Sequence, residues 1–117
     1  MSEAGNVFLH DVPAGIVWRD VRGYHFQYSP AYRASGRPAI SLTMPVREAP
    51  YSDPRALLPF FDNLIPEGWL LDVALDTWKL NPRDRMTLLL TLCRECIGAV
   101  RIDALPEDFS LPPHFDG

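Results

Sequence analysis

Lysine and long apolar runs are scarce in this sequence. Lysine occurs once, at Lys79, no block of Lys or Arg is present, and the formal net charge is -4. Because nucleic-acid affinity depends largely on neutralising phosphates, we expect no direct contact with DNA or RNA. No apolar run approaches the roughly 20 residues that a membrane-spanning helix needs, and the N-terminus lacks a basic segment followed by an apolar one. These absences predict a cytoplasmic protein without membrane contact.

The usual signatures of catalysis are also missing. The sequence contains no P-loop, no HExxH, no phosphate-cradling GxGxxG and no serine in an elbow context. Cys93 and Cys96 form a CxxC, which is half of a structural zinc site, and His10, His25 and His114 lie far from it. We therefore expect no enzymatic activity, no metal and no cofactor. A thiol oxidoreductase is the weaker alternative, because this pair ends an apolar helical segment and reads as two buried, reduced cysteines.

The first half of the chain has the pattern of β-structure. The apolar segments 7–9 and 16–18 are separated by turn formers at 11–15. A polar turn at 20–23, ending in Gly23, leads into residues 24–28, where aromatic and polar residues alternate with the period of a half-buried strand. These residues predict a β-meander.

The following stretch, residues 29–55, is expected to be mostly irregular. Ser29-Pro30 is typical of a turn, and residues 39–44 have the composition of one more short strand. Three prolines between positions 45 and 54 argue against a helix here.

The second half has the pattern of helices. Helices are predicted over 56–64 and 66–80, and a third begins at Asn81, which caps it, with Pro82 at its first position. Residues 96–102 resemble a closing strand. This order predicts an α+β domain in which a small, mostly antiparallel sheet, made of the N-terminal meander plus a closing C-terminal strand, packs against two to three helices. We assign residues 1–104 to this domain and residues 105–117 to a Pro-rich, acidic tail.

The most unusual stretch is 60–69, FFDNLIPEGW, where a proline, a glycine and a large aromatic residue meet at a helix boundary. In one interpretation this corner buries Phe60, Phe61 and Trp69 in the core. In the other, Trp69 points outward, because it lies two positions before Leu71 and about 200° around the helix from the inward stripe. Exposed Trp residues are enriched among interface hot spots. The sequence alone leaves both interpretations open.

Residues 60–68 resemble the "pFfenLLPEG" signature of the N-terminal domain of HipA-type kinase toxins. Four further segments resemble other parts of that domain in the expected order, namely 7–9 with 14–16, 24–28, 40–45, and 88–90 with 96–100. In HipA-type toxins the domain is fused to a much larger serine/threonine kinase core, whereas this sequence stops soon after Gly98-Ala99-Val100. It is therefore similar to the HipS family, the small antitoxins of three-gene HipBST toxin–antitoxin systems.

The resemblance implies two protein partners and a site. HipT, a HipA-like kinase toxin, would be bound and neutralised, and HipB, a DNA-binding protein, would belong to the same complex. We hypothesise that Trp69, supported by Phe61, Glu67, Gly68 and Asp72, docks on the kinase at or near its active site. The alternative is a scaffold that completes the kinase–HipB complex without inhibiting the kinase.

Overall fold

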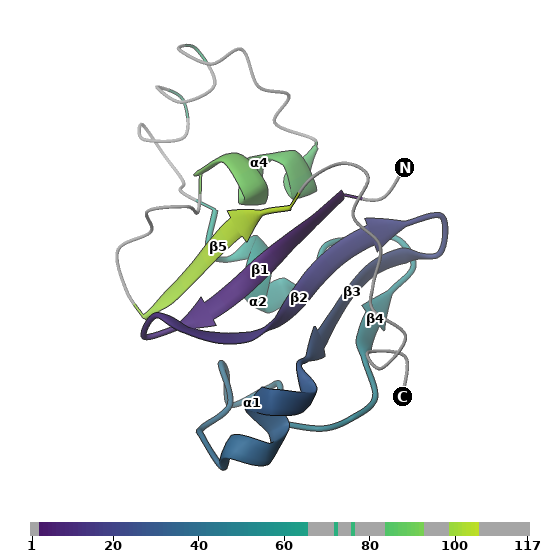
Figure 1. Ribbon diagram of the computed structural model, residues 1–117. Helices are drawn as coiled ribbons and strands as arrows, with labels where there is room; N and C mark the ends of the chain where they lie inside the picture. Colours follow the sequence, from purple (N-terminus) through teal and green to yellow (C-terminus); the bar gives the residue numbers. More distant parts are fainter. Residues whose placement is uncertain (1–2, 66–71, 73–75, 77–83, 93–98, 106–117) are drawn as a thin grey trace.

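The computed structural model describes residues 3–65, 72, 76, 84–92 and 99–105. They form one open, antiparallel sheet with the strand order β4-β3-β2-β1-β5 (Figure 1). The strands are β1 (Glu3–Leu9), β2 (Val12–Asp20), β3 (Gly23–Tyr28), β4 (Tyr51–Asp53) and β5 (Val100–Ala104), and the helices are α1 (Pro30–Ser35), α2 (Pro59–Asp62) and α4 (Arg85–Leu92). The predicted fold class, an α+β domain with a meander and a closing strand, is confirmed.

One face of the sheet, called the inner face below, packs against all three helices. Figure 1 shows α2 behind the sheet. Alternate residues of the strands meet Tyr32 of α1, Phe61 of α2, and Met86 and Leu89 of α4 in a single buried cluster. The opposite, outer face carries a much smaller apolar cluster of Ala4, Ile16 and Trp18, with Leu105 packed against it.

The meander is as predicted, but its first turn is shorter. Only His10 and Asp11 form the turn, with φ angles of 50° and 65°, which is the twist that suits a two-residue hairpin turn. Strand β2 therefore resumes at Val12, and the predicted turn over 11–15 is wrong. The second turn ends, as expected, at a glycine with positive φ, Gly23 (124°).

The stretch after the meander contains a helix, where irregular structure was predicted. The Ser29 side chain accepts a hydrogen bond from the Tyr32 backbone N–H (3.1 Å), so Ser29 is the N-cap of α1. Pro30 occupies the first turn, and Gly36 ends the helix with a φ of 72°. These are the preferred residues at each position. The sequence therefore did contain the signals for this short helix, and they lie upstream of the three prolines between positions 45 and 54.

The short strand expected at 39–44 is absent. Ser41 and Met44 make only an isolated bridge, because the buried Tyr28 hydroxyl organises this loop. That hydroxyl donates to the Met44 carbonyl (2.5 Å) and accepts from the Ile40 N–H (3.0 Å). The fourth strand is instead β4, which pairs with β3 through Phe26 and Tyr51.

Two helices of the second half, those predicted from residues 56 and 81, begin later than predicted. Helix α2 starts at Pro59. Helix α4 starts at Arg85, because the Asp84 side chain accepts from the Thr87 N–H (3.2 Å) as an N-cap. Strand β5 covers 100–104 in place of 96–102. Asn81, Cys93, Cys96 and most of the helix predicted over 66–80 lie outside the described residues.

Candidate partner-binding surface

The corner that precedes Trp69 is built by α2 and the turn after it. The Leu58 carbonyl accepts from the N–H groups of both Phe61 and Asp62 (3.0 Å each). The turn continues with Leu64 N–H donating to the Phe61 carbonyl (3.0 Å) and Ile65 N–H donating to the Asp62 carbonyl (3.2 Å). These four backbone N–H groups are thus used within one compact turn, and the chain reaches residue 65 along a fixed path.

Side chains anchor this corner to the core. Phe61 is fully buried, with its ring centroid 5.2 Å from that of Phe26 and 5.2 Å from that of Phe60. Ile65 is buried as well. Asp62 and Arg85 form an ion pair of 2.6 Å that ties α2 to α4. The corner is therefore held by packing on one side and by a charged pair on the other.

The structure places two of the five residues predicted to bind the partner. Phe61 is inside the core, so it supports the corner and offers no surface of its own. Asp72 is helical and exposed. Trp69, Glu67 and Gly68 lie outside the described residues, so their docking role stays a prediction.

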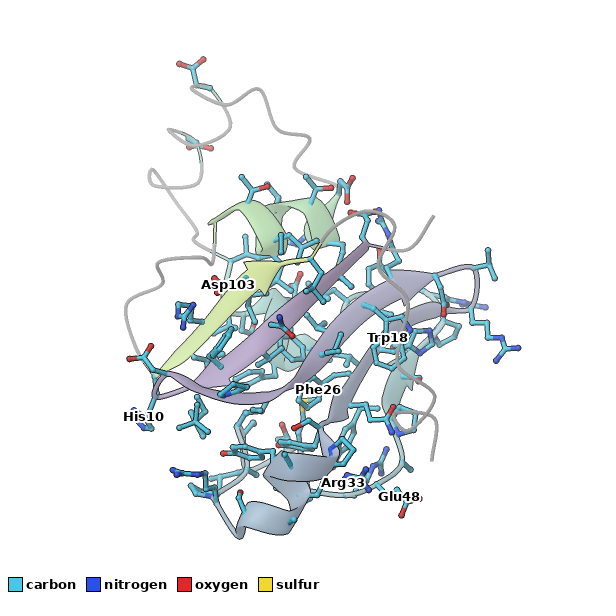
Figure 2. All side chains as sticks on the ribbon, viewed as in Figure 1. His10, Trp18, Phe26, Arg33, Glu48 and Asp103 are labelled. Carbon is cyan, nitrogen blue, oxygen red and sulfur yellow. The ribbon has the colours of Figure 1, made fainter. Side chains whose placement is uncertain are left out.

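A second candidate surface lies on the outer face and was not predicted. Here a cavity of about 820 Å³ opens between the end of β2 and the segment before β4. Trp18 and His25 line one part of it, and Glu48 and Ser52 line another. Figure 2 shows the labelled Arg33 beside Glu48, and their side chains form an ion pair of 3.7 Å.

A hydrogen-bonded chain of three side chains forms the wall of this cavity. His25 Nε2 lies 2.9 Å from Asp20 Oδ1, and His25 Nδ1 lies 2.7 Å from Ser52 Oγ. The Trp18 ring stacks on the imidazole at a centroid distance of 5.0 Å, and its Nε1–H donates to Asp20 Oδ2 (3.3 Å). The Asp20 carboxylate therefore forms a hydrogen bond with each of the two stacked rings, the imidazole of His25 and the indole of Trp18.

Asp20 is the charged member of this chain. Burial raises the pKa of its carboxyl, but the hydrogen bonds with His25 and the Arg22 N–H outweigh burial, and the net pKa is lowered. Asp20 is thus a carboxylate at neutral pH, and it accepts from Nε2–H. In the neutral imidazole Nδ1 then accepts from the Ser52 hydroxyl.

A hydroxyl, an imidazole and a carboxylate in series also occur in serine hydrolases. Here the three hydrogen-bonded side chains join the end of β2 to the edge strand β4 through β3. Among the described residues no group of three or more His, Cys, Asp or Glu side chains is placed to hold a metal ion. The arrangement therefore positions the outer face and its cavity.

Sequence reasoning missed this surface because it counted His25 and Gln27 as the solvent-facing members of an alternating strand. Both are buried, and Gln27 Nε2–H donates to the Glu48 carbonyl (2.9 Å). The available signal was the spacing of Trp18 and His25 about a two-residue turn, which makes them cross-strand neighbours.

Within the described part of the chain, no helix is long and apolar enough to cross a membrane.

The open antiparallel sheet with helices on one face places the chain among small α+β domains. More particularly, it belongs to the HipA N-terminal domain family, whose model matches residues 5–103. The solved N-terminal domain of HipA toxin is similar, with a TM-score of 0.67 and 29% identity, over 91% of this chain and 95% of that one. An uncharacterized protein of Haemophilus influenzae is 35% identical over 99 residues, which are 85% of this chain and 90% of that protein.

Proposed function

We propose that this chain is an antitoxin that binds and neutralises a HipA-like serine/threonine kinase toxin, HipT, by contact near its active site. The observation that supports this most is the coverage of the relatives. The chain spans 95% of a solved HipA N-terminal domain, and the Haemophilus influenzae relative matches over 90% of its own length. The domain thus accounts for nearly all of another short protein, as expected for a subunit that acts in trans.

The proposed binding partner of this domain is a kinase core. In the fused toxins the domain accompanies a kinase core, so a separate copy carries surfaces that suit a core of the same kind. In this proposal the chain contributes no catalytic group, acts in the cytoplasm, and shares its complex with the DNA-binding HipB. Inhibition then follows from occupancy of the kinase and not from chemistry.

The corner after α2 is the proposed point of contact. Phe61 and Ile65 are buried, and Asp62 is paired with Arg85 at 2.6 Å. The corner is therefore already formed in the free chain. Preorganised contact groups lose less conformational freedom on binding. In this proposal Trp69, with Glu67, Gly68 and Asp72, docks on the kinase beside this preformed corner.

Substitution of Trp69 tests the proposal. A buried hot-spot Trp contributes ~2–4 kcal/mol to binding, so we expect Trp69→Ala to weaken binding of the kinase roughly 30- to 1000-fold. Thermal melting should remain unchanged, and a titration with purified kinase measures the affinity. Normal melting together with full neutralisation would place the contact elsewhere.

A matched pair of acidic residues controls this experiment. Asp72 and Asp76 are both helical and exposed, and only Asp72 belongs to the proposed surface. Asp72→Ala should slow association with the kinase, because charges at an interface rim mainly affect the association rate. Asp76→Ala should leave it unchanged.

The scaffold alternative differs in one outcome. A scaffold that completes the kinase complex would raise or preserve toxin activity, whereas an antitoxin lowers it. Growth of cells that express the cognate kinase, with and without this chain, separates the two.

A further inference from the structure

The loop between α1 and β4 is fixed at its base by the core. Ile40 and Met44 are buried, and the backbone of both is bonded to the Tyr28 hydroxyl. A second buried tyrosine, Tyr32, donates its hydroxyl to the Pro38 carbonyl (2.6 Å). Two tyrosines of the core thus hold the loop in one conformation before any partner is present.

The tip of this loop presents a leucine to solvent. The Met44 N–H donates to the Ser41 carbonyl (3.1 Å), which closes a turn with Leu42 and Thr43 at its tip. Leu42 is fully exposed. Gly, Asn, Asp and Ser usually fill such positions, because each satisfies a requirement of the turn. A leucine satisfies none of these requirements, and here it gains no burial.

Leu42 lies at the edge of an apolar hollow. The hollow has a volume of about 440 Å³, and all but one of its lining residues are apolar, namely Pro38, Ala39, Ile40, Leu42 and Pro45, with Ser41 as the exception. A single exposed leucine is ordinary on a protein surface. An apolar hollow beside it, on a loop of fixed conformation, is a feature of binding surfaces.

The same loop carries positive charge in an acidic chain. Residues 30–47 contain three arginines and neither Asp nor Glu, so their formal charge is +3. The remainder of the chain, with eight basic and fifteen acidic residues, has a formal charge of -7. Two of the three arginines, Arg37 and Arg47, are exposed. They flank the apolar stretch in the sequence, at its beginning and at its end.

Both of these arginines are available to an acidic partner. Neither has a carboxylate partner among the residues that the structure describes. The Arg47 side chain donates to the carbonyls of Ala49 and Pro50 (3.1 and 3.0 Å), and its guanidinium lies 3.7 Å from the centre of the Tyr51 ring. This guanidinium is therefore held in place while its charge remains unpaired within the described chain.

We propose that residues 37–47, called the loop surface below, bind an acidic segment of a partner protein. An apolar side chain of that segment enters the hollow beside Leu42, and its carboxylates pair with Arg37 and Arg47. Arginine forms bidentate pairs with carboxylates. A nucleic acid would use the arginines but would leave the apolar hollow unfilled, so the loop surface suits a protein better.

The loop surface is distinct from the corner after α2. It directly follows α1, and Figure 1 shows α1 at one end of the molecule and α4 at the other. The corner is joined to α4 by the ion pair of Asp62 and Arg85. The inference is therefore independent of the proposed function, and it gives the chain a second surface for a partner.

The test uses NMR on the full chain with a synthetic peptide, Glu-Asp-Leu-Leu-Asp-Glu, as the probe. Backbone amide signals of residues 37–47 should shift and saturate as peptide is added. Leu42→Ser should weaken binding roughly 10-fold, because it removes one apolar contact. Arg37→Gln should weaken binding roughly 2- to 5-fold, as expected for an exposed ion pair. A peptide with Lys in place of its acidic residues should not bind.

The β2–β3 turn supplies matched controls. Val21 is fully exposed, and Arg22 is exposed without a carboxylate partner in the described part of the chain. Val21→Ser and Arg22→Gln make similar chemical changes away from the loop surface, so they should leave peptide binding unchanged. Melting curves check that every variant is folded.

Several outcomes would overturn the proposal. They are the absence of saturable shifts, shifts centred on the β2–β3 turn, and full binding by Leu42→Ser. Stronger shifts of the same signals with duplex DNA would identify a nucleic acid as the partner instead. Signals of residues 37–47 that change with protein concentration, in the absence of peptide, would identify a second copy of the chain.

Discussion

The two faces of the sheet are built on different physical principles. The inner face joins Val7, Val17 and Phe26 to the helices through apolar packing, which is non-directional. The outer face depends on Asp20, His25 and Ser52, whose bonds of 2.7–2.9 Å require particular atoms at particular places. The inner face therefore sets how stable the domain is, whereas the outer face is sensitive to pH and to the identity of single side chains.

The largest effect is expected on the inner face. Phe61→Ala removes a fully buried ring and should lower the free energy of unfolding by ~3–5 kcal/mol. Phe60→Ala, at the half-buried neighbouring position, should cost clearly less. Urea unfolding followed by circular dichroism measures both. A larger loss from any single substitution in the Asp20–His25–Ser52 chain would reverse the ranking of the two faces.

Tyr28→Phe tests a buried polar contact of the inner face. The change keeps the ring but leaves the Ile40 N–H and the Met44 carbonyl without their hydroxyl partner. Two unsatisfied buried groups should cost ~1–3 kcal/mol, with faster hydrogen exchange at the Ile40 amide. Tyr32→Phe is the control, because within the described part of the chain the Tyr32 hydroxyl makes one hydrogen bond, to the Pro38 carbonyl (2.6 Å). Equal costs would show that the loop does not depend on Tyr28.

Dependence on pH should separate the faces. The folded-state pKa of Asp20 is lowered, so its carboxylate stabilises the fold above the usual Asp range, and this contribution is lost as pH falls through the folded pKa. Asp20→Asn should cost about 1 kcal/mol at pH 7, and the difference from the unaltered protein should shrink below about pH 4. For Phe61→Ala the difference should stay constant. Urea midpoints measured from pH 7 to pH 3 give both curves.

The smallest effect is expected away from both faces. Leu42 is fully exposed at the tip of the loop held by Tyr28. Leu42→Ser should change the free energy of unfolding by less than about 0.5 kcal/mol, as measured by thermal melting. A larger loss would mean that this side chain is covered in solution.

The sequence predicted the inner face better than the outer one. Alternation at Tyr24, Phe26 and Tyr28 and the apolar positions Met86 and Leu89 identified residues that do pack together, because periodicity reports burial against a single layer. It does not report which polar residues meet across strands. The hydrogen bonds among Asp20, His25 and Ser52 join residues from different strands. The positions of these residues depend on the hairpin register and on a loop whose path depends on the Tyr28 hydroxyl. Spacing along the sequence therefore does not reveal these hydrogen bonds.

The candidate site was predicted in part for a similar reason. The FFDNLIPEGW stretch identified the corner through a family signature. The corner does contain a short helix, α2, and Phe61 is buried in it. That Phe61 would be wholly internal was one of two open interpretations, since a four-residue helix is too short to show a periodic stripe. Its burial depends on contact with Phe26, which is distant in sequence.

The position of β1 also has a consequence for synthesis. This first strand pairs with β2 on one side and with the last strand, β5, on the other. A chain emerging from the ribosome therefore presents β1 with one unpaired edge until the residues of β5 are available. Exposed strand edges recruit other chains, and pairings between distant segments form slowly. The interval before β5 arrives is the period in which a nascent chain of this fold is most exposed to aggregation.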